Sequence, residues 1–305
     1  MKIFKQLSFL ALEAILVSML AAEQRCPGNV ASLPFRFVHR AQIIAPVMIN
    51  RTGPYDFLVD TGTGITMIDS SLAAELQLKS EDEARVLAVG SQSRGSLSQL
   101  DLIEVGMRVV ANHQVVVRKL DYSLGADVHI QGILGANFLG HFDVFIDNAH
   151  NMLCLDDTGA LQTAVKGKHI SLVTTTPSAD GGGTPGSLIL AVHLSSIGSR
   201  PLLLKLDSGS NAQFLYDPAK YLNVGLSGSR LLQGRNLDGI VRTFALLPPQ
   251  KMRIGNIIFP QITFSTFLGT NRDGFRGEVD GILPTGLFRS VYIGYADRFV
   301  VLVPW

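Results

Sequence analysis

The chain has 305 residues, of which 47% are hydrophobic and 17% charged, and its formal net charge at pH 7 is +1. This balance argues against the basic stripe of a nucleic-acid-binding protein and against an acidic, metal-collecting tail. The length fits one large domain or two of ordinary size. The hydrophobic fraction and the 30 glycines are typical of buried, turn-rich β structure.

The first 22 residues predict a signal peptide. Lys2 and Lys5 flank the start of an apolar run over residues 7–20, and two alanines follow it as small residues near a cleavage point. Glu13 interrupts the run, which leaves an uncleaved membrane anchor as the alternative. We therefore expect an exported protein, either periplasmic or secreted.

The two cysteines, Cys26 and Cys154, could form one disulfide in an exported protein. Such a bridge would tie the mature N-terminus to a strand predicted at residues 152–155. The alternative is an unpaired, buried Cys154 with a dispensable Cys26. The sequence favours the unpaired alternative, because it does not supply the geometry that a bridge requires.

The first half of the chain begins with strands and turns. An apolar run at residues 57–59 leads into the turn Asp60-Thr61-Gly62-Thr63. After this turn, Asp69 is predicted to cap a short helix. The predicted strands are residues 34–38, 41–49 and 65–68, and the predicted helix is residues 70–78.

The second half repeats this order. An apolar run at residues 203–206 leads into Asp207-Ser208-Gly209-Ser210, a strand is predicted at residues 213–216, and Asp217 precedes Pro218 at the first position of a helix. A Gly-Ile-Leu segment follows each turn at a similar spacing. The segments after these also match, with residues 138–139 and 142–146 in the first half and residues 287–288 and 291–295 in the second. The repeat predicts two copies of one structural unit.

One carboxylate per copy, placed directly after an apolar strand, suits a hydrolase that uses paired acids. Asp60 and Asp207 are the candidate catalytic residues. Two like-charged acids in contact cannot both ionise, so they share one proton. The ionised member can then deprotonate a water while the protonated member donates to the carbonyl oxygen under attack. The alternative is that each aspartate only organises its turn.

This pattern resembles the aspartic protease superfamily and, within it, bacterial retropepsin-like proteins with two fused units. The resemblance covers the chain from about residue 33 to its C-terminus. It implies an all-β fold, mainly β with a few short helices, in which two pseudo-symmetric retropepsin-like β-barrel lobes enclose the active site. The expected domains are a signal peptide at residues 1–22, an N-terminal lobe at 33–158 and a C-terminal lobe at 166–305.

The resemblance also implies roles for the residues around the aspartates. Thr61 and Ser208 would hydrogen-bond across to the opposite lobe, and Gly62 and Gly209 would allow close approach and donate their N–H groups to the carboxylates. Thr63 and Ser210 would donate their hydroxyls to the outer carboxylate oxygens. Donors to the charged form favour that form, so we expect an acidic working pH.

The two Gly-Ile-Leu segments correspond to the psi-loops of the family. Their glycines are expected where the backbone passes close beside each aspartate turn. The psi-loop residues are Gly132, Ile133, Leu134, Gly281, Ile282 and Leu283.

Lys205 departs from the family pattern, in which this position is more often apolar. By strand alternation its side chain lies on the same face as that of Asp207. There it could border the substrate groove, lower the pH at which the dyad titrates or select an acidic substrate side chain. The alternative, which the sequence slightly favours, is that strand twist carries the ammonium to solvent.

Three segments between the motifs have weaker signals. Residues 176–186 are rich in glycine and form either a linker between the lobes or, as we prefer, an enlarged hairpin loop after a first strand at residues 169–175. Residues 89–99 and 233–243 are candidate flaps, the mobile hairpins that close over a bound peptide in related proteases.

The sequence thus predicts an exported aspartic endopeptidase with a peptide or protein substrate, no cofactor and no metal. The seven histidines show no metal-ligand spacing. Neither nucleic-acid binding nor stable membrane insertion after signal cleavage is expected, and a monomer suffices because both aspartates are in one chain. The alternatives are a peptide-binding protein with little or no activity and an envelope-associated structural protein held by an uncleaved N-terminus.

Overall fold

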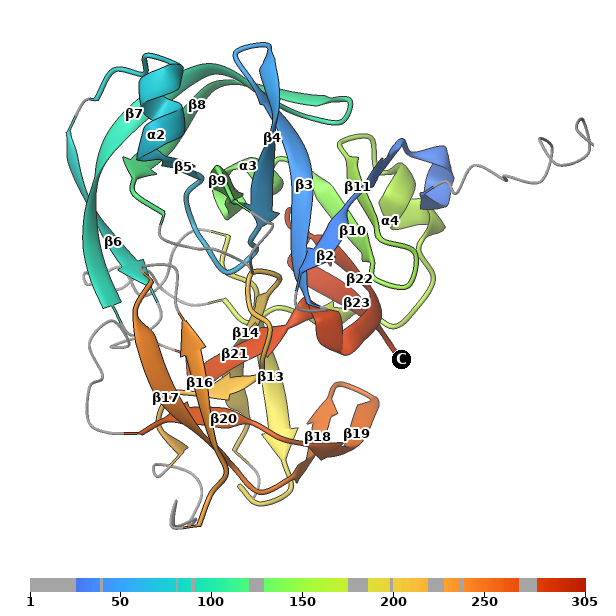
Figure 1. Ribbon diagram of the computed structural model, residues 1–305. Coiled ribbons are helices and arrows are strands. Elements are labelled where there is room, and N and C mark those ends of the chain that lie inside the picture. The colour runs from blue at the N-terminus through green and yellow to red at the C-terminus, as the bar shows by residue number, and fades with distance from the viewer. Residues whose placement is uncertain are drawn as a thin grey trace, which may run out of the picture.

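The computed structural model describes residues 26–38, 41–80, 82–88, 91–120, 129–174, 186–197, 200–218, 228–235, 239–268 and 279–305. The predicted signal peptide and nearly all of the glycine-rich stretch lie outside these ranges, as does the helix expected after Pro218. Strands form most of the described chain and the helices are short, which confirms the all-β class. Figure 1 places one large sheet in the upper half, another in the lower half, and a third beside them.

The first sheet contains the Asp60 segment. Its strands, in spatial order, are β2 (Arg36–Val38), β3 (Gln42–Ile49), β4 (Thr52–Val59), β9 (Gly132–Leu134), β5 (Met67–Asp69), β8 (Arg108–Arg118), β7 (Ser91–Val105) and β6 (Glu83–Ala88). An additional pairing of β3 with β7 closes the strands between them into a ring. The ring encloses buried side chains such as Phe57, Ile68 and Leu100.

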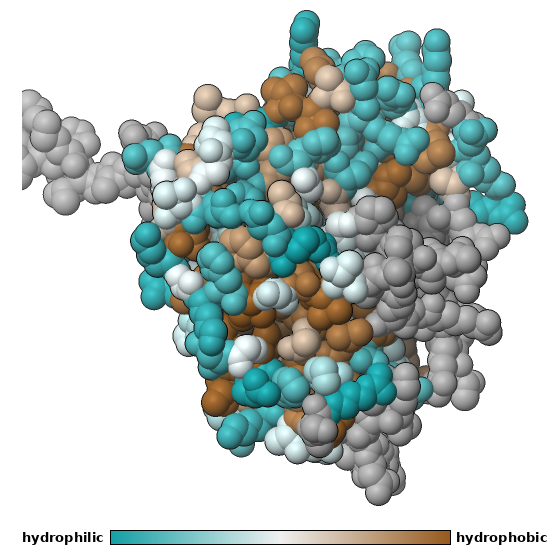
Figure 2. Space-filling model, turned by 180° about the vertical axis from the view of Figure 1, so that it is seen from behind, coloured by the Kyte–Doolittle hydropathy of each residue, from teal (hydrophilic) through white to brown (hydrophobic). Residues whose placement is uncertain are grey.

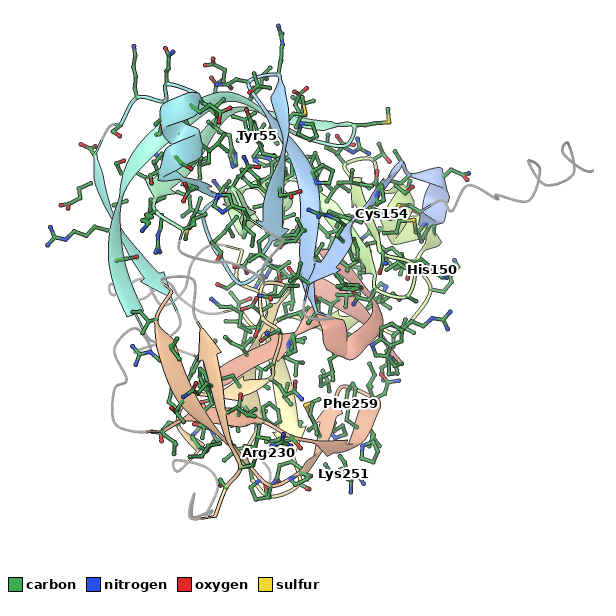
Figure 3. The ribbon with its side chains drawn as sticks, in the orientation of Figure 1. Tyr55, His150, Cys154, Arg230, Lys251 and Phe259 are labelled. Atoms are coloured by element: carbon green, nitrogen blue, oxygen red, sulfur yellow. A yellow bond between two sulfur atoms is a disulfide. The ribbon has the colours of Figure 1, made fainter. Side chains whose placement is uncertain are left out.

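The second sheet contains the Asp207 segment and is open. Its strands, in spatial order, are β16 (Leu231–Arg235), β17 (Val241–Leu246), β20 (Ser265–Phe267), β15 (Phe214–Leu215), β21 (Gly281–Pro284), β14 (Leu202–Asp207), β13 (Ile189–Leu194), β18 (Gln250–Ile254) and β19 (Ile257–Ile262). On β19, Phe259 packs its ring 5.8 Å from that of Phe288, which joins this sheet to the third one (Figure 3).

The third sheet draws strands from both halves of the chain. Its order is β1 (Ser32–Pro34), β11 (Met152–Asp156), β10 (Asp143–Asp147), β22 (Phe288–Gly294), β23 (Phe299–Pro304) and β12 (Ile170–Ser171). The pairing of β10 with β22 at its centre joins the first half to the second. Asn148 adds a buried link, because its side-chain amide donates to the carbonyls of Thr285 and Phe288.

Strand registers recur between the two halves. Gly132 pairs with Phe57 and Gly281 pairs with Leu204, so each psi-loop glycine lies opposite the third residue before an aspartate. At the edges of the third sheet, β1 pairs with β11 and β12 pairs with β23. The strand predicted at residues 169–175 is therefore present, although it is only two residues long.

The helices of the described residues are α2 (Ser70–Glu75), α3 (Ala136–Leu139) and α4 (Ala160–Ala164), with 3-10 turns η1 (Pro27–Asn29) and η3 (Thr285–Leu287). Asp69 caps α2 as predicted, because its carboxylate accepts from the Ser71 N–H at 2.8 Å. The helix ends three residues before the predicted Leu78. In the described part of the chain, no helix is long and apolar enough to cross a membrane.

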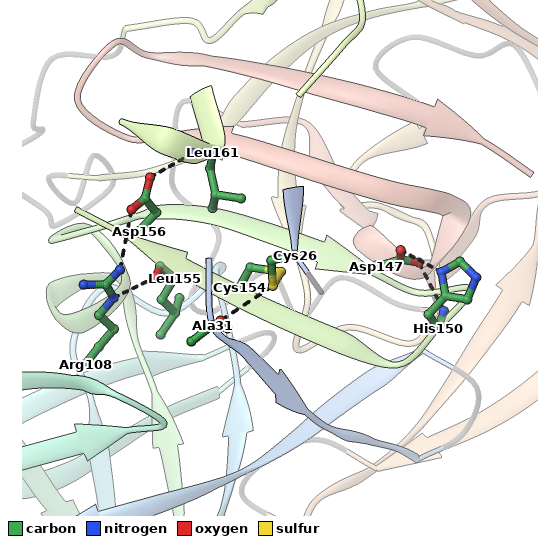
Figure 4. Close-up of a disulfide and its surroundings, with 9 residues drawn as sticks. All are labelled: Cys26, Ala31, Arg108, Asp147, His150, Cys154, Leu155, Asp156 and Leu161. Carbon is green, nitrogen blue, oxygen red and sulfur yellow. Dashed lines mark hydrogen bonds and ion pairs between the residues drawn. A yellow bond between two sulfur atoms is a disulfide. The ribbon is translucent and has the colours of Figure 1, made fainter. Parts of the chain in front are cut away.

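Cys26 and Cys154 form a disulfide, so the unpaired alternative for these cysteines is wrong (Figure 4). Their Cα atoms lie 6.0 Å apart, and both residues are buried. The sequence could not supply this proximity, which depends on β1 pairing with β11 and on η1 packing beside α4. The bridge therefore fixes the segment before β1 against the third sheet.

The surface opposite to the view of Figure 1 is mixed. Hydrophobic side chains gather toward its middle and lower part, where hydrophilic side chains interrupt them (Figure 2). Beneath the surface, the largest cluster of buried side chains includes residues of all three sheets.

Candidate active site

Two turns, one from each half of the chain, meet between the first and second sheets. The Asp60 turn (residues 60–63) follows β4, and the Asp207 turn (residues 207–210) ends β14. Both aspartates are buried, with 5% of Asp60 and 9% of Asp207 exposed. A Cβ atom added to Gly62 would collide with the Asp207 carboxylate, and one added to Gly209 would collide with that of Asp60. The predicted close approach of both glycines is therefore present.

Thr61 and Ser208 connect the two turns through reciprocal hydrogen bonds. The Thr61 hydroxyl donates to the Leu206 carbonyl at 3.0 Å and accepts from the Ser208 N–H at 3.1 Å. The Ser208 hydroxyl donates to the Val59 carbonyl at 2.7 Å and accepts from the Thr61 N–H at 3.1 Å. Each hydroxyl thus satisfies one donor and one acceptor of the opposite turn, as the family resemblance implies.

Within each turn, backbone N–H groups hold the aspartate. Asp60 Oδ1 accepts from the N–H groups of Gly62 at 2.8 Å and Thr63 at 3.1 Å. Asp207 Oδ1 accepts from those of Gly209 at 2.8 Å and Ser210 at 3.0 Å. These donors fix the orientation of both carboxyl groups and favour their ionised forms.

The outer oxygens differ between the turns. The Thr63 hydroxyl donates to Asp60 Oδ2 at 2.6 Å, as predicted. The Ser210 hydroxyl instead donates to the Ala212 carbonyl at 2.9 Å, so the predicted bond from Ser210 to Asp207 is wrong. A short side chain next to an accessible carbonyl satisfies itself within its own loop, a local competition that the repeat pattern does not reveal.

The surroundings of Asp207 change its protonation. Burial is the largest cause that raises the pKa of Asp207 well above its usual value of 3.8, and the negative charge of Asp60 adds to the effect. The positive charge of Lys205 and the N–H of Gly209 act in the opposite direction without cancelling it. A carboxyl with a raised pKa stays protonated at a pH where an ordinary aspartate is charged, so Asp207 is suited to donate a proton.

Lys205 does not extend into solvent, so the slightly favoured interpretation of its side chain is wrong. Its ammonium donates to the carbonyl of Gly62 at 3.2 Å, across from β14 to the Asp60 turn. The site also contains a residue that the sequence did not single out. Gln42 is 1% exposed on β3, and its side-chain amide donates to the carbonyl of Gly209 at 2.7 Å.

The psi-loop glycines lie beside the aspartate strands rather than beside the turns themselves. A Cβ on Gly132 would collide with the Phe57 ring, and one on Gly281 would collide with the Phe214 carbonyl. The close approach at the first turn occurs farther along, where the Asp60 N–H donates to the Leu134 carbonyl at 3.0 Å. The expectation that both glycines are required by the aspartate turns is therefore wrong, because the close contacts are with Phe57 and Phe214. The remaining psi-loop residues Ile133, Ile282 and Leu283 are buried in the same strands.

A second buried polar network supports the Asp60 turn. The Thr66 hydroxyl donates to Asn137 Oδ1 at 2.8 Å and accepts from the Gly135 N–H at 3.2 Å. His113 lies 3.1 Å from the same hydroxyl, and burial lowers the pKa of His113 to about 4. His113 is therefore a neutral core residue, consistent with a structural role.

Both flap candidates fall at hairpins whose tips lie outside the described residues. Strand β6 pairs with β7 up to Ala88 and Ser91, and β16 pairs with β17 up to Arg235 and Val241. The first hairpin therefore turns earlier in the chain than the centre of the predicted range at residues 89–99. In the part of the chain that the structure describes, no group of His, Cys, Asp and Glu side chains could hold a metal ion.

Comparison with known families supports one half of this site directly. Residues 45–138 match the family model of aspartyl proteases. The matched range contains the Asp60 turn and its psi-loop, and the Asp207 turn lies beyond it. No curated protein matches the chain.

Proposed function

We propose that this protein is an exported aspartic endopeptidase that hydrolyses peptide bonds with a water activated between Asp60 and Asp207. The observation that carries the proposal is the pair of buried aspartates brought into contact by reciprocal hydrogen bonds between the two turns. Burying two acids together is costly, and a structural turn does not require it. The match of residues 45–138 to aspartyl proteases supports a protease-type function independently.

The hydrogen bonds around the dyad suggest how it divides the chemistry. Asp60 accepts from two backbone N–H groups and the Thr63 hydroxyl, whereas Asp207 accepts from backbone N–H groups. Asp60 is therefore better suited to hold the negative charge and take a proton from water. Asp207, protonated because of its raised pKa, would donate to the carbonyl oxygen of the scissile bond.

The proposed substrate is an extended peptide lying between the first and second sheets. The hairpins β6–β7 and β16–β17 would flank it and offer backbone groups for pairing, as in strand addition. The recurring registers support a two-lobe organisation, with lobes at residues 33–158 and 166–305. Both aspartates come from one chain, so a monomer would be active.

Export is proposed from the sequence of residues 1–22, and the disulfide is consistent with an oxidising compartment. Mass spectrometry of the mature N-terminus would test it. A start near Glu23 would support cleavage of the signal peptide, and an intact Met1 would support an anchor.

The test of activity is cleavage of a diverse peptide library at pH 3 to 8 by the mature wild type and three variants. Asp60→Asn and Asp207→Asn each remove one acid at nearly constant size. Asp101→Asn is the matched control, because Asp101 is exposed on β7 and distant in sequence from both turns. We expect the first two variants to lose about 10³-fold or more in kcat/KM and the control to match wild type.

Binding measurements separate the proposal from its alternative. If wild type, folded by circular dichroism, cleaves nothing at any pH but binds peptides as Asp60→Asn does, the protein is a peptide-binding protein. Equal cleavage by wild type and Asp60→Asn would contradict the dyad mechanism.

A further inference from the structure

The carbonyl groups of Gly62 and Gly209 each accept a side-chain hydrogen bond from the opposite half of the chain. Gly62 receives the ammonium of Lys205 at 3.2 Å, and Gly209 receives the amide of Gln42 at 2.7 Å. The two glycines occupy equivalent positions in their turns. Their partners do not, because one is a cation and the other is neutral.

Each of these carbonyls belongs to a peptide group whose N–H faces an aspartate. The Gly62 carbonyl shares its peptide group with the Thr63 N–H, which donates to Asp60 Oδ1 at 3.1 Å. The Gly209 carbonyl shares its peptide group with the Ser210 N–H, which donates to Asp207 Oδ1 at 3.0 Å. A donor at the oxygen of a peptide group polarises its N–H, so hydrogen bonds on the two ends strengthen each other. A cationic donor does so more than a neutral one.

We propose that Lys205 is a positioning residue that sets the pH range of the dyad through its bond to the Asp60 turn, with Gln42 as its neutral counterpart at the Asp207 turn. The inference deepens the proposed peptidase function and rests on it for the dyad's role. Lys205 acts across the two turns, without contacting substrate, and favours the ionised forms of the dyad.

Strand registers show that this difference is not part of the repeat. Lys205 pairs with Ile189, and the equivalent pair in the first half is Leu58 with Ile44. Leu58 is fully buried in an apolar cluster, so the first half has no cation at this position. Each half thus reaches the opposite turn from a different place, the first from Gln42 on β3 and the second from Lys205 on β14.

The other titratable groups near the dyad do not replace Lys205. Tyr216 is close enough to Asp207, and Tyr295 to Asp60, for the carboxylates to act on them. Burial raises the pKa of Tyr216 and of Tyr295 above 10, so both phenols are neutral at acidic pH. Arg298 acts on Tyr295, and its guanidinium donates to the carbonyls of Ser187 and Val173 at 3.0 and 3.1 Å. The positive charge of Lys205 acts to lower the pKa of Asp207, so it favours the ionised form of that acid as well.

The test follows the titration of the dyad directly, by carbon-13 NMR of protein labelled at aspartate carboxyl carbons. Resonances are assigned with Asp60→Asn and Asp207→Asn. Lys205→Arg keeps the charge, Lys205→Gln keeps a neutral donor of the kind Gln42 supplies, and Lys205→Met keeps only the aliphatic stem. Lys251→Gln, an exposed lysine of the same sheet on β18 (Figure 3), is the matched control.

In wild type we expect the labelled carboxyl carbons of the dyad to report two coupled ionisation steps. Lys205→Gln and Lys205→Met should move both steps upward by about one pH unit, since a nearby cation favours the ionised forms. Lys205→Arg and Lys251→Gln should leave them in place. In peptide cleavage, both limbs of the pH profile should move by the same amount.

Two results would overturn the inference: titration steps unmoved in Lys205→Gln, or equal shifts in Lys251→Gln. A purely structural role would lower the amount of active enzyme without moving either limb. If the carbons titrate as expected while no peptide is cleaved, the proposed function fails and the role of Lys205 in the titration of the dyad stands. If peptides are cleaved and the limbs do not move in Lys205→Gln, the inference alone fails.

Discussion

The Asp60 turn and the Asp207 turn share their backbone hydrogen bonds and differ in the side chains around them. In both, Oδ1 accepts from the N–H groups of the glycine and the residue after it. Thr63 adds a hydroxyl donor at Asp60 and Ser210 adds none at Asp207, while the two glycine carbonyls receive a cation and an amide respectively. A duplicated backbone can thus hold two identical acids in place while its side chains give them different tasks.

The hydroxyl bonds between the turns are where the two halves are most alike, and removing them should have the largest structural effect. Ser208→Ala leaves the Val59 carbonyl and the Thr61 N–H without their partner at a fully buried position. We expect a loss of about 3 kcal/mol in the free energy of unfolding, measured by denaturant titration. Thr61→Val should cost a similar amount.

The controls for this prediction keep a hydroxyl at each position. Thr61→Ser and Ser208→Thr exchange the residue types of the two turns and should each stay within about 1 kcal/mol of wild type. If Ser208→Ala is as stable as Ser208→Thr, the reciprocal bonds do not hold the halves together. A large loss in one turn only would show that the two bonds are not equivalent.

Much of this likeness could be predicted from the sequence, and most of the difference could not. The repeated Asp-Thr/Ser-Gly pattern predicts the two turns, because a turn is a local structure. The roles of Thr61 and Ser208 between the turns follow from the resemblance to aspartic proteases. Gln42 gives no such signal, since it is one polar residue at the start of an apolar strand. Its partner Gly209 lies 167 residues away in the sequence.

The sequence singles out Lys205 but does not predict where its ammonium points. Strand alternation places a side chain on one face of a sheet, and the twist and neighbours of the strand decide where a flexible ammonium ends. The disulfide of Cys26 and Cys154 could not be predicted for the same reason, since it depends on how the strands pair across the third sheet. The predicted hydroxyl bond from Ser210 to Asp207 fails for a smaller reason, because a carbonyl in the same loop accepts that hydroxyl instead.

The outer-oxygen bonds separate the turns functionally, with a smaller effect. Thr63→Val removes the donor to Asp60 Oδ2 at nearly constant volume, and we expect kcat/KM to fall about tenfold to a hundredfold, because bonds to charged groups are strong. Ser210→Ala removes a bond to a backbone carbonyl near the surface and should lower kcat/KM less than about threefold. Equal losses in the two variants would contradict the different roles assigned to the turns. Thr63→Ser, which keeps the hydroxyl, should restore most of the activity.

The pH dependence of stability gives the smallest and most specific contrast, between Asp207 and Asp156 of β11. Because the pKa of Asp207 is raised above 3.8 in the folded protein, its contribution to stability is complete below pH 3.8 and is lost as pH rises through the folded value. Burial alone would raise the pKa of Asp156, but hydrogen bonds from Thr158 and Leu161 and the charge of Arg108 lower it overall. Its contribution is therefore present above pH 3.8 and is lost as pH falls.

Melting temperatures of wild type, Asp207→Asn and Asp156→Asn between pH 3 and 7 test this contrast. The stability of wild type relative to Asp207→Asn should decrease as pH rises, with a limiting slope of about 1.4 kcal/mol per pH unit. Relative to Asp156→Asn it should increase over the acidic part of the range. Slopes of the same sign would mean that Asp207 is held as an ordinary hydrogen-bonded carboxylate, and the assignment of the proton to Asp207 would have to be abandoned.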